Sequence, residues 1–239
     1  MSGTGTQTLD VISKAGHFNK WMYQVIEPFL KGEVLEIGSG IGNISAFAVQ
    51  GGTSITLSDL EGQYRQYLQE KFSGFANVKG IISLDLQHPD FKTAYVSLKG
   101  KFQTVFLLNV IEHLQDDRAA VSNCRYLLKY GGCLVILAPA YQGLFCRFDK
   151  ELGHYRRYTV HQLQRLISRE NFETVHKQYF NLLGIAGWFV FGKLLKKKMI
   201  GSSEMQLYNH LVPVLKFADK LVLSQAGLSA ILVGKNSDK

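Results

Sequence analysis

The chain has 239 residues, 46% of them hydrophobic and 19% charged, which is enough apolar material for one sizeable core. Its three cysteines form no C-x-x-C pair, which argues against a disulfide framework or a zinc site and favours a reducing compartment. The formal net charge of +8 is scattered along the sequence and is typical of a solvated basic surface, although it also allows an anionic partner.

Neither a secretory signal nor a membrane span is predicted. The first ten residues lack a basic start and an apolar centre. No apolar run reaches about 18 residues, the length that a membrane-spanning helix needs. The nearest, LLGIAGWFVFGKLL at 182–195, is interrupted by glycines and leads into three lysines at 196–198. We therefore expect a cytoplasmic protein.

The pattern of apolar residues predicts strands and helices in alternation. A leading helix covers 18–30. Strands are expected at 33–37, 54–59, 78–83, 102–109 and 133–137, with helices at 41–49, 63–72 and 116–128 among them. A helix at 160–170 capped by Thr159, a strand at 172–180 and a last strand at 229–234 follow. About 50 residues separate the last two strands, with helical character at 182–195 and 206–223. We interpret them as an insertion over the ligand edge.

This alternation predicts a mostly parallel sheet with helices on both faces. Right-handed crossovers bring the loops after the strands to one edge of the sheet, where open α/β sheets bind ligands. Gly38, Asp59, Asp85 and Asn109 each follow a predicted strand. We therefore expect these four residues to lie around one crevice.

The stretch VLEIGSGIGN at 34–43 is a buried strand followed by a turn with three glycines. Such turns aim backbone N–H groups at a ligand. The absence of G-K-[ST] argues against a P-loop. Glu36 would repel phosphates but accept a hydrogen bond from a cationic amino group, which S-adenosylmethionine carries. Asp59 suits a ribose diol, and Asp85 with Leu86 lies where an adenine amino group would sit.

The ordered motifs EIGSGIG, Asp59, Asp85-Leu86, NVIEH at 109–113 and LLKYGG at 127–132 resemble the class I S-adenosylmethionine-dependent methyltransferases. The FNKW segment at 18–21 and GHYRRYT at 153–159 resemble a subfamily of glycan, lipid and natural-product pathways. The resemblance implies a Rossmann-like α/β fold with seven strands, the last antiparallel, and no metal. It implies S-adenosylmethionine as cofactor. The expected cofactor-binding residues are Glu36, Gly38, Ser39, Gly40, Gly42, Asp59, Leu60, Asp85, Leu86 and Asn109.

We expect a single methyltransferase domain over 1–239. Residues 1–32 form a helical cap, 33–180 and 229–235 form the core, and 181–228 form a helical lid.

Two stretches offer groups for the methyl acceptor. An oxygen acceptor usually needs a base to remove its proton, and His113 and His154 are the candidates. His113 could instead be a structural histidine at a helix start. The loop at 148–159 is dense in polar groups, and its arginines either clamp an anionic substrate or pair with Asp149 to pin the loop. The expected substrate-binding residues are His17, Phe18, Trp21, Tyr155, Arg156 and Trp188.

The sequence thus favours methyl transfer to oxygen or nitrogen of a small molecule, in natural-product or secondary metabolism. One alternative is action on a glycan or lipid-linked substrate at a membrane surface. A second is a non-catalytic module that docks on lipid through GWFVFGKLLKKK. Nucleic acid is not an expected partner, because only the net charge supports RNA and no separate basic module is present.

Overall fold

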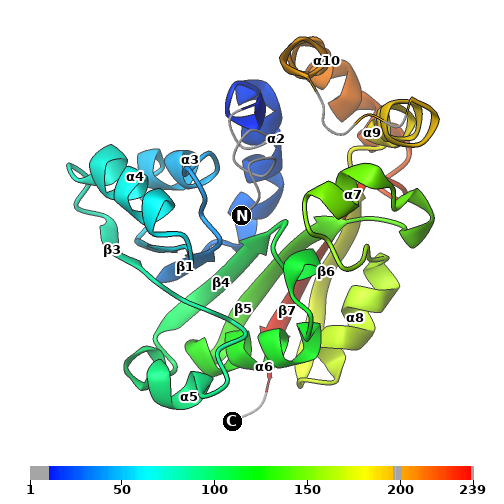
Figure 1. Ribbon diagram of the computed structural model, residues 1–239. Helices are drawn as coiled ribbons and strands as arrows, with labels where there is room; N and C mark the ends of the chain where they lie inside the picture. Colours follow the sequence, from blue (N-terminus) through cyan, green and yellow to red (C-terminus); the bar gives the residue numbers. More distant parts are fainter. Residues whose placement is uncertain (1–10, 196, 198–200, 238–239) are drawn as a thin grey trace.

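The computed structural model describes residues 11–195, 197 and 201–237 (Figure 1). Residues 1–10 of the predicted cap, and 196 and 198 of the basic run, lie outside the described residues. The strands are β1 (Val34–Ile37), β2 (Ile55–Ser58), β3 (Val78–Ile82), β4 (Phe102–Leu108), β5 (Leu128–Pro139), β6 (Phe172–Phe180) and β7 (Ser229–Asn236).

The α-helices are α2 (Gly16–Ile26), α3 (Ser45–Gln50), α4 (Gly62–Phe72), α5 (Phe91–Ala94), α6 (Asp117–Leu127), α7 (Arg147–Glu151), α8 (Val160–Ser168), α9 (Gly184–Trp188) and α10 (Ser202–Leu221). Short 3-10 turns are η1 (Glu27–Phe29), η2 (Val96–Leu98), η3 (Ile111–His113) and η4 (Gln142–Leu144). Helix α9 continues into the π-helical segment η5 (Phe189–Leu194).

The seven strands form one sheet in the order β3-β2-β1-β4-β5-β7-β6. Strands β1 to β5 pair in parallel, and β7 is antiparallel to both β5 and β6. The predicted Rossmann-like sheet with an antiparallel last strand is therefore confirmed. Ile37 at the end of β1 lies level with Ser58 of β2 and Leu107 of β4, so the following loops begin at one edge.

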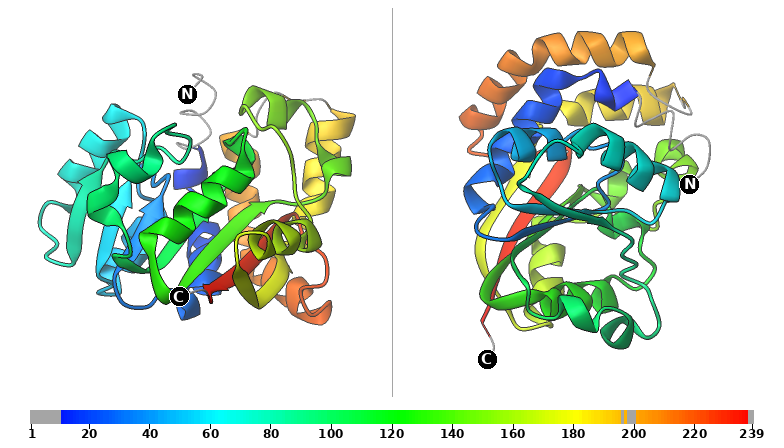
Figure 2. Two further views of the ribbon diagram at one scale, coloured as in Figure 1. Left: turned by 90° about the horizontal axis from the view of Figure 1, so that it is seen from below. Right: turned by 90° about the vertical axis from the view of Figure 1, so that its left-hand side faces the viewer.

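Alternate residues of the central strands supply the two faces of the core, as the pleat requires. Leu35, Val105 and Leu134 belong to the buried cluster that includes residues of α6 and α8. Their neighbours Val34, Phe106 and Val135 belong to the cluster that includes residues of α2, α3 and α4. The helices thus cover both faces of the sheet, as predicted (Figure 2).

Two predicted boundaries move for local reasons. Helix α3 begins at Ser45 rather than 41, because Gly40 and Gly42 have φ of 54° and 73°, outside the helical region. Strand β5 is longer than predicted and begins at Leu128, before the glycine pair at 131–132. The predicted cap at Thr159 is present, and its hydroxyl oxygen accepts from the Gln162 N–H at 3.2 Å.

The insertion between β6 and β7 contains α9, η5 and α10. Helix α10 lies alongside α2 (Figures 1 and 2). Val212 and Leu215 of α10 pack in a buried cluster with Trp21 and Phe180. No helix in the described ranges combines the length and the apolar character needed to cross a membrane.

A buried carboxylate ties the insertion to the end of β6. The two oxygens of Asp219 accept hydrogen bonds from the N–H groups of Asn181 at 2.6 Å and Leu182 at 2.7 Å. Asn181 has φ of 70°, and its side-chain oxygen accepts from the Tyr208 hydroxyl and, at 3.0 Å, from the Gly184 N–H. These bonds fix the start of α9 against α10.

We expect Asp219→Ala to destabilise the insertion by about 2 kcal/mol, because two buried N–H groups lose a charged acceptor. Hydrogen exchange should accelerate in α9 and α10 while β1, β4 and β5 keep their protection. Asp219→Asn, which retains one acceptor oxygen, should show a smaller change. Unchanged exchange in α10 of the alanine variant would contradict this role.

Candidate active site

The turn after β1 leaves little room for side chains at its glycines. The Gly38 and Ser39 N–H groups both donate to the Ser58 carbonyl at 2.9 Å. Gly38 has φ of 74°, and a Cβ there would lie 2.5 Å from Cγ2 of Val110, in the segment after β4. A Cβ at Gly42 would lie 2.8 Å from both Leu68 and Phe72 of α4. At both positions the positive φ and the neighbouring side chains therefore favour glycine over a larger residue.

Asp59 joins this turn to the end of β2. Its Oδ2 accepts from the Gly40 N–H at 2.8 Å, and its Oδ1 accepts from the Glu61 N–H at 2.9 Å. Burial raises the pKa of Asp59, and these two backbone donors oppose the rise. Each carboxylate oxygen can accept a further hydrogen bond. The next side chain, Leu60, is 56% exposed beside it.

Glu36 lies beneath the same turn. Its carboxylate accepts a hydrogen bond from the Ser45 hydroxyl, and burial raises its pKa to about 7. The Ser39 hydroxyl oxygen accepts from the Ser58 N–H at 3.2 Å, so this side chain serves the turn itself. Lys71 donates from Nζ to the carbonyls of Ile41 at 2.9 Å and Gly42, which holds α4 against the turn.

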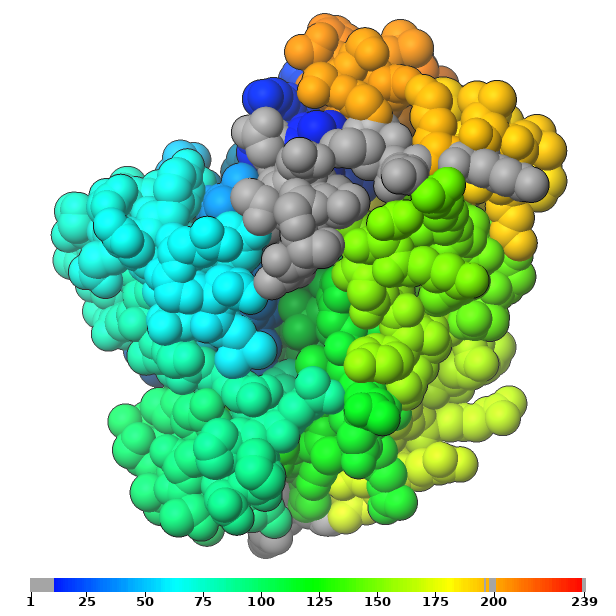
Figure 3. Space-filling view, viewed as in Figure 1, coloured from blue at the N-terminus to red at the C-terminus, as the bar shows by residue number. Residues whose placement is uncertain are grey.

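The residues after β3 and β4 complete this edge. Asp85 is half-buried, and its Oδ1 accepts from the Gln87 N–H at 2.8 Å. The side chain of Leu86 belongs to the buried core. Asn109 is exposed and has φ of 53°. In the space-filling view, a recess opens between the surface around 60–75 and the surface that follows β4 (Figure 3).

The loops after β4 and β5 are joined to each other beside this recess by hydrogen bonds and an ion pair. The Tyr155 N–H donates to the Glu112 carbonyl at 2.8 Å, and the Tyr158 hydroxyl donates to Asp117 Oδ2 at 2.9 Å. Arg156 donates to the Gln115 carbonyl at 2.7 Å and pairs with Asp117 at 2.9 Å. Arg156, which was predicted to bind substrate, therefore joins the two loops in this structure.

Asp149 is the centre of a buried network in the second loop. Its Oδ1 accepts from Arg157 Nε at 2.8 Å and lies 2.9 Å from His154 Nδ1. Burial acts to raise the pKa of Asp149, but the bonds from His154 and Arg157 outweigh it and lower the pKa. The Arg157 guanidinium also lies 4.4 Å from the centre of the Trp188 ring. The arginines were predicted either to bind an anionic substrate or to hold the loop in place through Asp149. Arg157 does the second.

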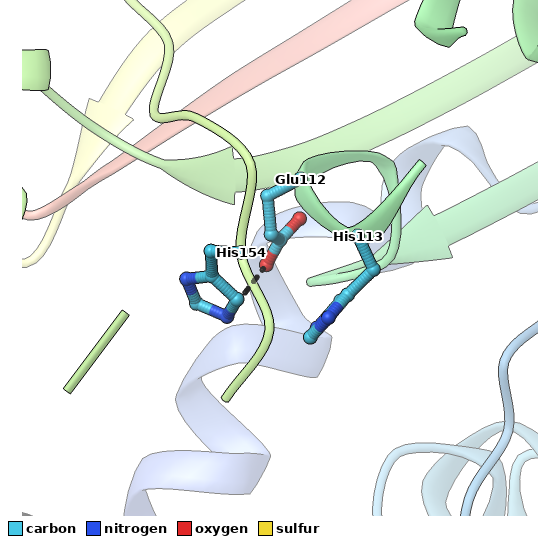
Figure 4. Close-up of side chains that lie close together, drawn as sticks. All are labelled: Glu112, His113 and His154. Carbon is cyan, nitrogen blue, oxygen red and sulfur yellow. Dashed lines mark ion pairs between the residues drawn. The ribbon is translucent and has the colours of Figure 1, made fainter. Parts of the chain in front are cut away.

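A second carboxyl faces the other side of His154. Glu112 Oε1 lies 4.0 Å from His154 Nε2 (Figure 4). The Glu112 side chain is fully buried, and neither oxygen has a hydrogen-bond partner among the residues that the structure describes. Burial raises its pKa to about 8. The His113 ring lies 4.6 Å from the His154 ring, and burial, followed by the neighbouring His154, lowers the pKa of His113 to about 4.

This cluster of Glu112, His113, His154 and Asp149 can store or accept a proton. Since Asp149 takes the hydrogen at Nδ1, the lone pair of a neutral His154 lies at Nε2, towards Glu112. Glu112, His113 and His154 also offer ligand atoms within 4.8 Å of one another, an arrangement open to a cation. Sequence reasoning named both histidines as candidate bases and Asp149 as a partner that could pin the loop, but it did not count Glu112 among the site residues. The available signal was an acid among apolar residues in VIEHL.

The other predicted acceptor residues occupy different environments. His17 is exposed, and Tyr155 is 54% exposed. Trp21 is buried, with its ring 4.4 Å from that of Phe180, and Phe18 packs 6.3 Å from Trp21. Trp188 donates from Nε1 to the Leu144 carbonyl at 3.2 Å. Contact between these side chains and an acceptor stays a prediction.

The strand order, the glycine turn and the acids at the strand ends define an S-adenosylmethionine-dependent methyltransferase fold. Residues 18–177 match the model of a family described as a methyltransferase domain, and the chain belongs to this family. S-adenosylmethionine is its cofactor. The residues fit this group, since the Asp59 carboxylate can accept further hydrogen bonds next to a turn in which Gly38 is exposed and beside the exposed side chain of Leu60.

Similar proteins include natural-product and metabolic enzymes. The chain is 30% identical over 119 residues to a highly reducing polyketide synthase, resH, of Aspergillus sclerotiorum. The match covers 46% of the chain and only 4% of that much longer protein.

Solved structures share the fold at low sequence identity. A putative sarcosine dimethylglycine methyltransferase of Galdieria sulphuraria aligns with a TM-score of 0.62 at 13% identity, over 93% of this chain and 86% of that one. A phosphoethanolamine N-methyltransferase 2 of Haemonchus contortus, in complex with S-adenosylmethionine, gives 0.60 at 18% identity, over 92% and 52%.

The raised pKa of Glu112 predicts how stability depends on pH. Since the folded state holds this proton more tightly than the unfolded state, the stability that it contributes is complete below about pH 4.5 and is lost as the pH rises through about 8. Glu112→Gln is neutral throughout. Its free energy of unfolding in urea should therefore fall less than that of the wild type between these pH values.

Glu70→Gln, on the exposed side of α4, is the control and should follow the wild-type profile. Parallel profiles for Glu112→Gln and the wild type would mean that Glu112 is ionised in the fold and balanced by a cation.

Proposed function

We propose that the protein transfers the methyl group of S-adenosylmethionine to an oxygen or nitrogen atom of a small molecule in natural-product or secondary metabolism. The observation that carries this proposal is the cluster of Glu112, His154 and Asp149, in which Glu112 comes two residues after Val110, the residue that packs against Gly38 of the glycine turn. The match to a polyketide synthase supports the substrate class.

In this proposal the edge of the sheet holds the cofactor. Asp59 accepts hydrogen bonds from the ribose hydroxyls, and Asp85 and Leu86 lie beside the adenine. Glu36 faces the amino group, directly or through water, and the turn around Gly38, Ser39, Gly40 and Gly42 takes the amino-acid end. Asn109 lines the methyl position. When bound, the cofactor supplies an activated methyl group, so the protein's main task is to orient the acceptor.

His154 is the proposed general base. Asp149 orients its ring and fixes the hydrogen at Nδ1, which leaves Nε2 to take the acceptor's proton. Glu112, 4.0 Å from Nε2, lies close enough to pair with the imidazolium once its own carboxyl is ionised. His113, held neutral by burial, closes the other side of the ring. His17, Phe18, Trp21, Tyr155, Arg156 and Trp188 are the proposed wall for the acceptor.

Cofactor affinity should depend on pH through Glu36. A cationic amino group beside Glu36 favours the ionised carboxylate, so binding must release the proton that burial retains up to about pH 7. We expect affinity to weaken by about tenfold for each pH unit below this value. Calorimetry with S-adenosylmethionine measures this. Glu36→Gln should bind more weakly at neutral pH and lose the pH dependence.

Glu33→Gln, an exposed position just before β1, is the matched control and should retain the wild-type pH dependence. If Glu36→Gln kept that dependence, another group would be responsible, and the proposed contact would be wrong.

The proposed base is tested with methyl-labelled S-adenosylmethionine and a panel of phenols, hydroxy acids and primary amines, with products identified by mass spectrometry. For the best hydroxyl acceptor, His154→Gln should lower kcat by about a hundredfold or more and leave cofactor affinity unchanged. Asp149→Asn should lower kcat as well, because it disturbs the tautomer.

Since no metal takes part in this proposal, dialysis against a chelator should leave the rate unchanged. Loss of activity that Mg²⁺ or Zn²⁺ restores would assign the cluster to a metal ion. Wild-type kcat in His154→Gln would remove the base from the proposal, and transfer to none of the panel would remove the substrate class.

A further inference from the structure

The Glu112 carboxyl is buried without a hydrogen-bond donor. Among the residues described, its two oxygens are the only buried side-chain nitrogen or oxygen atoms that have no hydrogen-bond partner. Leaving a buried polar group unpaired is unfavourable, so in a native protein such a group indicates a bound proton, water or ion. The groups that face this carboxyl then indicate what it binds.

Two histidines face the carboxyl. Nε2 of His154 lies 4.0 Å from Oε1 of Glu112, and the rings of His113 and His154 are centred 4.6 Å apart. One ligand atom from each of the three residues lies within 4.8 Å of the other two, and the side chains converge in Figure 4. A tetrahedral ion with bonds of about 2.0 Å holds its ligand atoms about 3.3 Å apart, so inward movements of about 1 Å would close the site.

Partners outside the cluster hold both rings. Asp149 Oδ1 lies 2.9 Å from His154 Nδ1, which leaves the lone pair of a neutral His154 at Nε2, towards Glu112. The backbone of Leu152 and Gly153 hydrogen-bonds to the His113 ring. Histidines that bind metals almost always donate their other ring N–H to a carboxylate or a backbone carbonyl. Both rings therefore have the support that a metal ligand needs.

The surrounding charges leave Glu112 for a cation. The Asp149 carboxylate is already paired with Arg157 at 2.8 Å. Among the ion pairs of the described residues, Glu112 takes part only in that with His154, so no permanent cation lies within ion-pair distance of it. The Tyr155 N–H donates to the Glu112 carbonyl at 2.8 Å and holds the two loops together, so the ligands are positioned before an ion binds.

We propose that Glu112, His113 and His154 form a binding site for a divalent transition-metal ion, of which Zn²⁺ fits the ligand set best. Imidazole nitrogen suits zinc, copper, iron and nickel, whereas magnesium and calcium prefer oxygen ligands. Two imidazoles and one carboxylate leave the fourth position of a tetrahedral Zn²⁺ open to water. The three ligands are distinct from the residues proposed to hold S-adenosylmethionine, and the site is independent of the methyl acceptor.

One consequence rests on the function proposed above. The lone pair at His154 Nε2 that would bond to the ion is the same one that would take the acceptor's proton. A single lone pair cannot do both, so bound Zn²⁺ blocks the base and the metal-free chain is the active form. The cluster would thereby make methyl transfer sensitive to the concentration of free zinc.

The test of the site is calorimetric titration of ZnCl₂ into the full chain, after dialysis against a chelator and removal of the chelator. We expect one ion per chain, and an excess of MgCl₂ should not compete. Glu112→Gln and His154→Gln should each weaken binding at least tenfold, because each removes a bond to the ion. Asp149→Asn should weaken it by about tenfold through the orientation of the ring.

His210→Gln is the matched control, since His210 is an exposed histidine on α10. It should bind Zn²⁺ like the wild type. Calorimetry with S-adenosylmethionine, unchanged in every variant, would show that the fold is intact. Absence of one-to-one Zn²⁺ binding would overturn the site, and so would wild-type affinity in both Glu112→Gln and His154→Gln.

The inhibitory consequence is tested in the methyl-transfer assay. Zn²⁺ should lower the wild-type rate, and a chelator should restore it. A rate that rises with Zn²⁺ would overturn the inhibition. Zn²⁺ binding without transfer to any acceptor would support the metal site and contradict the proposed function, whereas transfer without Zn²⁺ binding would do the reverse.

Discussion

The site depends on the close approach of the turn after β1 to the segment after β4. A Cβ at Gly38 would come within 2.5 Å of Val110, so the two segments can meet only where the first carries no side chain. The same turn is tied to β2 through the bond from Gly40 to Asp59 and held by Lys71 of α4. Three strand ends and one helix are thereby brought to one edge of the sheet.

A buried charge cluster sets the geometry on the other side of the recess. Asp149 and Arg157 form an ion pair at 2.8 Å in an almost solvent-free position. Buried pairs of this kind are retained when further hydrogen bonds satisfy the remaining groups. His154 and the Cys146 N–H supply such bonds to Asp149, whereas the Glu112 carboxyl receives none from the residues described. The proton that burial retains on Glu112 keeps this carboxyl neutral beside the Asp149–Arg157 pair.

Much of the fold follows from patterns that are local in sequence. Strand β6 has the predicted bounds of 172–180, because its period-2 alternation and flanking residues are unambiguous. The glycines after β1 predict a turn. The residue at which α3 begins could not be predicted, because it depends on the positive φ values that the turn adopts against α4. The convergence of Gly38, Asp59 and Asn109 could be inferred from topology alone, since parallel strands place their following loops at one edge.

The second half of the site was harder to predict because neighbouring side chains take opposite directions. Arg156 and Arg157 are adjacent and chemically alike, but one joins Asp117 at the surface and the other is buried against Asp149 and Trp188. The path of the loop decides which arginine is buried, and backbone hydrogen bonds such as that from Tyr155 to Glu112 set this path. The burial of Glu112 likewise arises only when both loops meet.

The position of β7 between β5 and β6 has a consequence for assembly. Strand β6 hydrogen-bonds only to β7 within the described sheet, although β6 is synthesised some fifty residues earlier. Strand β6 cannot join the sheet until β7 has paired with β5. Such non-local pairing is slow to form. The chain must therefore be synthesised as far as the end of β7 before β6, with α8 and the insertion, can join the rest of the sheet.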